Sequence, residues 1–414
     1  MSKYLRIAVF LMLVVAMLPL AGSSNAQDKV TIRITTWAGV EEAAEFQTII
    51  DEVNASQDAI EIIHEPKPSD YMLTLQTSLA GGEAADLMWL GLCDMAMAYE
   101  DVLLDFTDYL EGDARPAANP DDYFADVWQA GVFDGGVYGM PWIAQPVVLF
   151  YNKDIFDEMG VEYPNPDWSW DDFKQAAMDL TNEEHYGFTM KDDWPPPELW
   201  VYSFGGELVN EDLTEAPIDS PEVIDAVNFW ASMIWNEEMT PSQETIAEEG
   251  FEAMMRAGRV AMFIGGAADD YERSTEGTVG VSMMPKGPVG ENVTTAWIGF
   301  TAINADTEHP QEAYDAMVML SEGIHNWKPS PRISHANVEH LVESIPYKAD
   351  TAEDIVAALP YMRPEYKVFP GVGEFMWSTW RAEFTKKVAL GEGTADELAP
   401  DVRILLEDIL ANID

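Results

Sequence analysis

Cysteine is nearly absent from this chain, which contains Cys93 and no other. A single cysteine excludes an internal disulfide and any zinc site built from several thiolates. We expect Cys93 to be a small apolar side chain in the interior. The His-Glu-x-x-His motif of zinc enzymes and the Gly-x-Ser-x-Gly elbow of serine hydrolases are missing too. The six histidines are scattered, and the five-residue spacing of His335 and His340 indicates surface or capping roles. No metal, cofactor or catalytic residue is therefore assigned.

Basic residues are scarce: 22 Lys and Arg stand against 74 Asp and Glu, for a net charge of −52. Nucleic acids and anionic membranes would be repelled by this charge, which excludes both as partners. A hydrophobic content of 47% excludes a disordered acidic tail. The acids are spread as pairs such as Asp121-Asp122, and their repulsion is tolerable where salt screens it. We interpret the excess as an adaptation to high salt; the alternative, a cation-binding surface, has no clustered ligand motif.

Long apolar runs are missing after residue 26, which predicts a soluble mature protein. Before that point, Lys3 and Arg6 precede an apolar run at 7–21, and small residues follow at Ser24 and Ala26. This pattern predicts a secretory signal cleaved near Ala26, and hence a periplasmic or extracellular protein. A retained membrane anchor is the alternative. A lipid anchor is disfavoured because no cysteine follows the run.

The mature chain is too long for one ordinary core, so two domains are expected. Its first part alternates strand and helix patterns, with period-two strands and apolar residues at helical spacing. The predicted elements are a strand at 29–36, a helix at 43–53, a strand at 59–64, a helix at 71–79 and a strand at 86–90. This order is typical of an open parallel sheet with helices on both faces.

Two breaks rich in glycine and proline divide the rest of the chain, at 131–142 and at 285–288. Ser169 and Asp172 form a capping-box pattern that predicts a helix start. The other predicted elements are strands at 147–151, 260–264 and 297–304, helices at 155–159, 223–234, 250–258, 313–320 and 396–413, and a loop at 191–206. No internal repeat is visible, which disfavours a solenoid.

Several stretches, in order along the chain, resemble the extracellular solute-binding proteins of family 1, the group that includes maltose-binding protein. They are Gly-Val-Tyr-Gly-Met-Pro-Trp142, Leu-Phe-Tyr151-Asn-Lys-Asp-Ile-Phe, Phe204-Gly-Gly-Glu-Leu, the stretch 251–266, Val279-Gly-Val-Ser-Met-Met-Pro-Lys-Gly-Pro288 and Trp297-Ile-Gly-Phe-Thr-Ala-Ile-Asn304. The resemblance implies an α/β, two-lobed periplasmic-binding-protein fold of type II. Each lobe would be an open, mainly parallel sheet flanked by helices, and hinge strands would join the lobes. The implied N-terminal lobe is 27–141 plus 286–321, and the C-terminal lobe is 142–285 plus 322–414.

The resemblance implies a receptor of an ABC importer rather than an enzyme, which closes on its ligand by a hinge motion. The expected partners are a small-molecule ligand and, transiently, the permease subunits, and the receptor itself is expected to be a monomer. A sugar is the expected ligand, because tryptophan rings suit the C–H faces of a pyranose and many of the 14 Trp stand in predicted loops. Where the maltose-binding member has an aromatic residue, this chain has Ala267-Ala268-Asp269-Asp270, which argues against maltodextrin.

Ligand contacts carried over from the family fall in loops that follow predicted strands. They are Trp37, Glu41, Trp89, Asp94, Trp142, Gln145, Trp194, Trp200, Gly265, Gly266, Trp297 and Trp377. Core packing is the alternative for Trp89, which ends a buried strand, and for the tryptophans at 194, 200 and 377. Trp230 lies on an apolar helical stripe and is expected in the core.

Two other functions remain open at this point. A receptor for a cationic solute such as a polyamine fits the acidic charge and the aromatic content. A secreted glycoside hydrolase would be rich in tryptophan and acidic residues as well, but it needs two positioned carboxylates, which an acid count does not identify.

Overall fold

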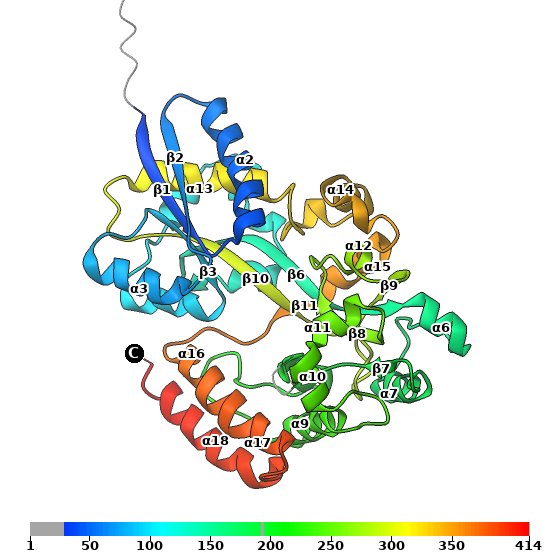
Figure 1. Ribbon diagram of the computed structural model, residues 1–414. Helices are drawn as coiled ribbons and strands as arrows, with labels where there is room; N and C mark the ends of the chain where they lie inside the picture. Colours follow the sequence, from blue (N-terminus) through cyan, green and yellow to red (C-terminus); the bar gives the residue numbers. More distant parts are fainter. Residues whose placement is uncertain (1–28, 192–193, 414) are drawn as a thin grey trace, which may run out of the picture.

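The computed structural model describes residues 29–191 and 194–413, so the predicted secretory signal at 1–26 lies outside the described residues. Figure 1 shows two lobes, with β1 to β3 in one and the C-terminal helices in the other. Long strands run between the lobes through the middle of the molecule.

The first lobe begins with alternating strands and helices: β1 (Val30–Thr36), α2 (Val40–Ser56), β2 (Ile60–Pro66), α3 (Tyr71–Gly81) and β3 (Leu87–Gly91). β1 pairs in parallel with β2 and with β3. The buried face of α2 carries Phe46, Ile50 and Val53, at the helical spacing that its apolar residues predict. α3 ends at Gly82, whose φ of 68° is a left-handed conformation that glycine adopts without steric cost. The predicted β-α-β-α-β order is confirmed.

Two long strands, β6 (Gly139–Asn152) and β10 (Thr294–Ile303), join the lobes. β10 lies antiparallel to β3, and the first half of β6 lies antiparallel to β10. The second half of β6, from Val147, pairs antiparallel with β8 (Val260–Gly266) and β9 (Val279–Ser282) of the second lobe. We expected a strand only at 147–151, which was too short. Pro146 stands where β6 changes partner, and its missing N–H is tolerated at such a point.

The second lobe contains most of the middle of the chain. Its elements are α6 (Lys153–Met159), α7 (Trp170–Asp179), β7 (Tyr186–Phe188), α8 (Glu198–Ser203), α9 (Pro221–Ile234), α10 (Gln243–Glu249), α11 (Phe251–Arg256), β8, α12 (Tyr271–Ser274) and β9. The predicted capping box at Ser169 and Asp172 begins α7. The predicted loop at 191–206 was wrong in part, because 198–203 form α8. All six residues of α8 are buried, so burial fixes a helix that has no amphipathic pattern.

The remaining elements complete both lobes. They are α4 (Thr107–Leu110), α5 (Ala125–Gln129), β4 (Val132–Phe133), β5 (Gly136–Val137), α13 (Pro310–Ile324), α14 (Val338–Ser344), α15 (Ala352–Ala358), β11 (Met362–Pro364), α16 (Val372–Glu374), a π-helix at Phe375–Thr385, α17 (Lys386–Ala389) and α18 (Ala395–Leu410). α13 packs against α2 in the first lobe, whereas α17 and α18 pack against α9 in the second (Figure 1). Within 29–191 and 194–413, no helix is both long and apolar enough to cross a membrane.

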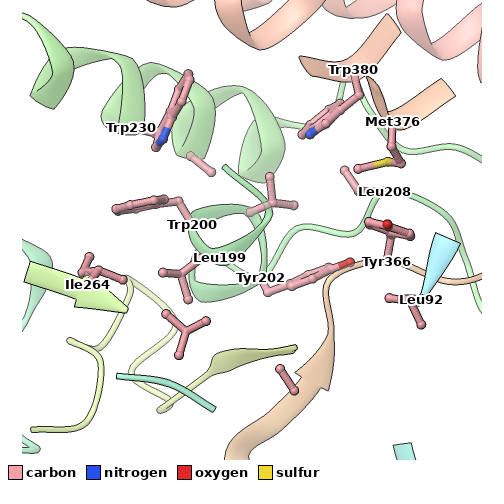
Figure 2. Packing of buried hydrophobic residues seen from close by; sticks show 14 of the residues in the cluster. Leu92, Leu199, Trp200, Tyr202, Leu208, Trp230, Ile264, Tyr366, Met376 and Trp380 are labelled. Atoms are coloured by element: carbon pink, nitrogen blue, oxygen red, sulfur yellow. The ribbon is translucent and has the colours of Figure 1, made fainter. Parts of the chain in front are cut away.

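The sheet order is β2-β1-β3-β10-β6-β8-β7, with β11 beside β10 and β9 beside β6. The α/β two-lobed architecture is confirmed, but the mainly parallel sheets that we expected are mixed, because β10 runs antiparallel to β3 and β6, and β6 runs antiparallel to β8. The core of the second lobe contains Trp200, Trp230 and Trp380, as Figure 2 shows. Trp230 was predicted to lie there, and it has no exposed surface.

Candidate functional site

A cavity of about 590 Å³ lies between the lobes, against the middle of β6 and β10. The first lobe contributes residues 91–93 after β3, and the second contributes Gly266 and Asp269 after β8. The C-terminal end of a strand from each lobe therefore meets this cavity, as is usual for ligand sites in open α/β sheets. Its volume lies within the range of small-molecule sites. The cleft, as we call it below, is the candidate functional site.

Aromatic side chains form much of the cleft wall. Trp297 of β10 is 38% exposed, and Trp377 of the π-helix is 56% exposed. Trp194 lines the same space, and its indole Nε1–H donates to the carbonyl of Ile264 at 3.1 Å. Phe251 at the start of α11 adds a fourth ring. Large exposed rings are unfavourable in water, and so they indicate a ligand with flat apolar faces.

Two buried tryptophans support the wall from beneath. Trp89 of β3 and Trp142 of β6 stack with ring centroids 4.1 Å apart, and neither is more than 1% exposed. Trp37 packs against this stack. Its ring centroid lies 5.4 Å from that of Trp89 and 6.0 Å from that of Trp297. A side chain at Gly299 would meet the Trp142 ring within 3 Å, so this glycine allows the ring to lie flat against β10. The stack therefore supports the rings of Trp37 and Trp297, which lie nearer the cleft.

Polar groups at the end of β8 form a second part of the lining. Gln145 Oε1 accepts a hydrogen bond from the Ala268 backbone N–H at 2.7 Å, and Asp269 Oδ2 accepts one from Gly266 N–H at 2.9 Å. A Cβ on Gly266 would meet Gln145 Oε1 at 2.3 Å, which explains the glycine at this position. Gln145 stands directly opposite Trp297 across the β6–β10 ladder. An amide and a tryptophan ring therefore face the cleft side by side.

Carboxylates outnumber cations among the charged groups of the cleft. Glu252, Asp269 and Glu365 line it together with Lys191 and Arg381. Burial raises the pKa of Asp269 to about 6 against the opposing hydrogen bond from Gly266. Burial, with the nearby charge of Glu198, raises the pKa of Glu365 to about 7. Both carboxyl groups have lost part of their hydration through burial. Hydrogen-bond donors on a ligand would therefore stabilise them.

Cys93 lines the cleft as well, so its surroundings differ from the interior position that we expected. Burial and the charge of Asp94 raise the pKa of its thiol to about 11. A thiol with that pKa is protonated at neutral pH and is a poor nucleophile. The carboxylate of Asp94 accepts the S–H of Cys93, with Sγ 3.6 Å from Oδ1.

The twelve predicted ligand contacts are distributed unevenly around the cleft. The five that line it are Gln145, Trp194, Gly266, Trp297 and Trp377. Three others lie beside it: Trp37 packs on Trp297, Gly265 precedes Gly266 in β8, and Asp94 caps the turn after β3 by accepting from Gly91 N–H at 3.0 Å. Glu41 is exposed in the first turn of α2.

The other three predicted contacts, Trp89, Trp142 and Trp200, are fully buried. Trp89 and Trp142 form the stack beneath the cleft. Trp200 lies in the core of the second lobe beside Trp170, with ring centroids 5.0 Å apart, and Figure 2 shows it among Leu199 and Trp230. The structure therefore does not bring Trp200 to the cleft. Trp200 belongs to α8 rather than to the predicted loop, and the core packing given as its alternative is what the structure shows.

Sequence reasoning missed most of the lining. Phe251, Glu252, Asp269, Tyr366 and Arg381 all face the cleft. Arg381 follows Trp377 by four residues, which is the spacing of neighbours on one helical face and is the signal that could have found it. The acidic residues carried no such signal among 74 acids.

Metal ligands do not gather in the described parts of the chain, where no group of three or more His, Cys, Asp or Glu could hold an ion. His335 and His340 lie closer than their spacing indicated, with ring centroids 3.8 Å apart. His340 Nε2 bonds to the carbonyl of His325 at 3.0 Å, and His335 Nδ1 bonds to Ser330 Oγ at 3.0 Å. These bonds tie the segment after α13 to α14.

Comparisons with known proteins agree with this geometry. The family described as bacterial extracellular solute-binding protein matches residues 38–321. A chain from Brucella abortus (strain 2308), named as a binding protein, is 25% identical over 387 residues, which cover 88% of this chain and 89% of that one. An ABC substrate-binding protein from Listeria monocytogenes, solved in complex with cycloalternan, is 25% identical with a TM-score of 0.80, over 93% of this chain and 100% of that one. The maltotriose-binding protein of Pyrococcus abyssi is 26% identical over 216 residues, 49% of this chain and 43% of that one.

Proposed function

Since the chain belongs to the bacterial extracellular solute-binding proteins, we propose that it captures a sugar or oligosaccharide in the interlobe cleft for an ABC importer. The observation that carries this proposal is the exposure of Trp297 and Trp377 in one cavity, beside Gln145 and the carboxylates. Indole faces cover the C–H faces of a pyranose, and amide and carboxylate oxygens accept from its hydroxyls. The bound cycloalternan of the Listeria relative supports an oligosaccharide as the ligand class.

Closure of the lobes is the proposed means of signalling that ligand is bound. We propose the lobes at 27–141 plus 286–321 and at 142–285 plus 322–414, with β6 and β10 as the crossing strands. A ligand that touches both lobes stabilises the closed form by its differential affinity, which shifts the population toward that form. The permease subunits would then distinguish the closed receptor from the open one, docking transiently on a monomer.

Export and a saline habitat complete the proposal. The signal pattern at 1–26 supports cleavage near Ala26 and release to the periplasm or the exterior. The net charge of −52 supports a protein that works where salt screens its acids.

Hydrolysis of the ligand is not part of the proposed function. Two of the three cleft carboxylates have partners, which supports binding rather than catalysis: Glu365 is paired with Arg381, with Oε2 3.4 Å from Nη2, and Asp269 Oδ2 accepts from Gly266 N–H. Incubation with oligosaccharides should therefore release no shorter products detectable by chromatography. Measurable turnover that follows the purified protein would favour a glycoside hydrolase instead.

A cationic solute is the second candidate, and the excess of carboxylates over cations in the cleft favours it. A thermal-shift screen in molar KCl separates the two ligand classes. A ligand present at 100 times its Kd adds about 2.7 kcal/mol to the stability of the folded state. We expect sugars to produce the shift; a shift with polyamines and none with sugars would reject a sugar as the ligand.

A further inference from the structure

Three charged side chains meet behind the wall of the cleft. Glu198, in the first turn of α8, has no exposed surface. Its Oε1 lies 3.2 Å from Arg381 Nη2 in the π-helix, and the same nitrogen lies 3.4 Å from Oε2 of Glu365. The second oxygen of Glu198 is buried, and no described residue forms a hydrogen bond with it. One guanidinium thus serves two carboxylates, and one of these is incompletely satisfied.

This arrangement lowers the stability of the folded state, which points to a functional role for Glu198. Burying a carboxylate without a full set of hydrogen-bond partners destabilises the folded state. A protein of this fold could place a hydrophobic side chain at Glu198, where the neighbours Leu199 and Trp200 are fully buried. The titratable groups that interact with the trio from adjoining elements are Tyr202 and Tyr366. Glu207 and Arg363 adjoin Tyr202, and Cys93 adjoins Tyr366, one step further from the trio.

Arg381 links the trio to the cleft. Its guanidinium carbon lies 4.4 Å from the centroid of the Trp377 ring, a cation–π distance. Trp377 precedes Arg381 by four residues on the π-helix, and both line the cleft. π-Helical turns are rare and are frequent at functional sites. Trp377 is half exposed, and this contact helps to fix the plane of its ring at the cleft wall.

We propose that Glu198 is a positioning residue, which anchors the Arg381 guanidinium so that the Trp377 ring is held at the cleft wall. Glu365 competes for the same guanidinium nitrogen, so the position of the ring depends on whether Glu365 carries a proton. Glu198 itself is too deeply buried to touch a ligand. The placement of the ring rests on the contacts above; only its use for sugar binding rests on the proposed function.

A ligand-free experiment tests the placement directly. The fluorescence of Trp377 is obtained by subtracting the emission spectrum of Trp377→Phe from that of the wild type. This difference is followed from about pH 5.5 to about pH 8.5, on either side of the Glu365 pKa of about 7. We expect this component to change with a midpoint near that pKa. Glu198→Gln keeps the shape and removes the carboxylate that raises the pKa of Glu365 next after burial, so the midpoint of the component should move to lower pH. In Glu365→Gln the component should be constant across the range.

Glu207→Gln is the matched control, because Glu207 pairs with Arg363 at 2.9 Å rather than with Arg381. This control should keep the wild-type pH response. An unchanged pH response in Glu198→Gln, or loss of the response in Glu207→Gln as well, would overturn the proposal. Should Glu198→Gln fail to fold, Glu365→Gln decides, since retention of the wild-type response in that variant contradicts the shared guanidinium.

A binding experiment then tests the consequence for ligand, with cycloalternan as the probe. Loss of a positioned cation–π partner should weaken binding by roughly fivefold in Glu198→Gln. Glu198→Gln made in the Trp377→Phe protein should weaken binding less, and in the Trp377→Ala protein it should not change binding. An equal effect in all backgrounds would show that Glu198 does not act through Trp377. If the wild type binds no sugar, the ligand class of the proposed function is wrong, while the fluorescence result still decides the role of Glu198.

Discussion

Truncation of Trp377 to alanine should weaken ligand binding by about an order of magnitude. A tryptophan exposes up to about 250 Å², and the side chain of Trp377 is 56% exposed in the cleft wall. One pyranose face that covers half of this exposed area removes about 70 Å² from water, which is worth about 1.8 kcal/mol at 25 cal/mol per Å². That free energy corresponds to roughly a twentyfold increase in Kd. Isothermal titration calorimetry in molar KCl, with the sugar that gives the largest thermal shift, measures it.

Trp235→Ala is the matched control for this measurement. Trp235 is 49% exposed, but it lies at the end of α9 near Leu390, on the outside of the second lobe. Its indole N–H donates to the Ala389 carbonyl, so it too is held by one polar contact. We expect its Kd to stay within about twofold of the wild type. If Trp377→Ala binds as tightly as the wild type, or if both variants lose affinity equally, Trp377 does not form the wall on which the ligand lies.

Three further predictions concern stability. Lys348→Met should lower the free energy of unfolding, measured by urea denaturation, by about 3–5 kcal/mol. The reason is that it leaves Glu272, whose Oε1 lies 2.9 Å from Lys348 Nζ, buried without its partner. The double variant with Glu272→Leu should recover most of the loss, and no recovery would show that the broken pair is not the cause. Because the pKa of Glu365 is raised, the folded state keeps a proton between about pH 4.5 and about pH 7 that the unfolded state releases. The contribution of Glu365 to the free energy of unfolding is therefore complete below about pH 4.5 and is lost as pH rises through about 7. Glu365→Gln should therefore be neutral near pH 4.5 and should raise the stability by up to about 3 kcal/mol near pH 8; equal differences at both pH values would refute this. The melting temperature should fall when KCl is lowered from molar to millimolar concentration, because screening of a net charge of −52 is removed; equal stability at both would contradict the saline adaptation.

The first lobe was predictable because its local patterns and its tertiary structure agree. Ile32 and Ile34 alternate in β1, and Phe46, Ile50 and Val53 recur at helical spacing in α2; all of these residues are buried as those periods require. Gly82 ends α3 where the sequence places a glycine pair. At each of these positions a local rule acts in the same direction as burial, so the sequence alone is sufficient.

The cleft was harder to predict because its residues come from distant parts of the chain. Trp89 and Trp142 were interpreted as ligand contacts, yet they form a buried stack that depends on the absence of a side chain at Gly299, more than 150 residues after Trp142 in sequence. β6 was predicted too short because proline weakens a strand pattern, whereas here Pro146 stands at the change of partner strand. Such features depend on pairing between segments, which periodicity along one segment does not report.

The central claim is that a sugar closes the two lobes over the cleft, and the single cysteine offers the most direct test. Cys93 lines the cleft, so alkylation by a maleimide reports on access to this space at one site in the chain. The alkylation rate is measured in molar KCl, at a mildly alkaline pH because burial raises the pKa of the thiol to about 11. We predict that a saturating sugar, tested as cycloalternan, maltotriose and arabino-oligosaccharides, slows the alkylation at least about tenfold. An unchanged rate with every sugar, together with protection by a polyamine, would contradict the claim.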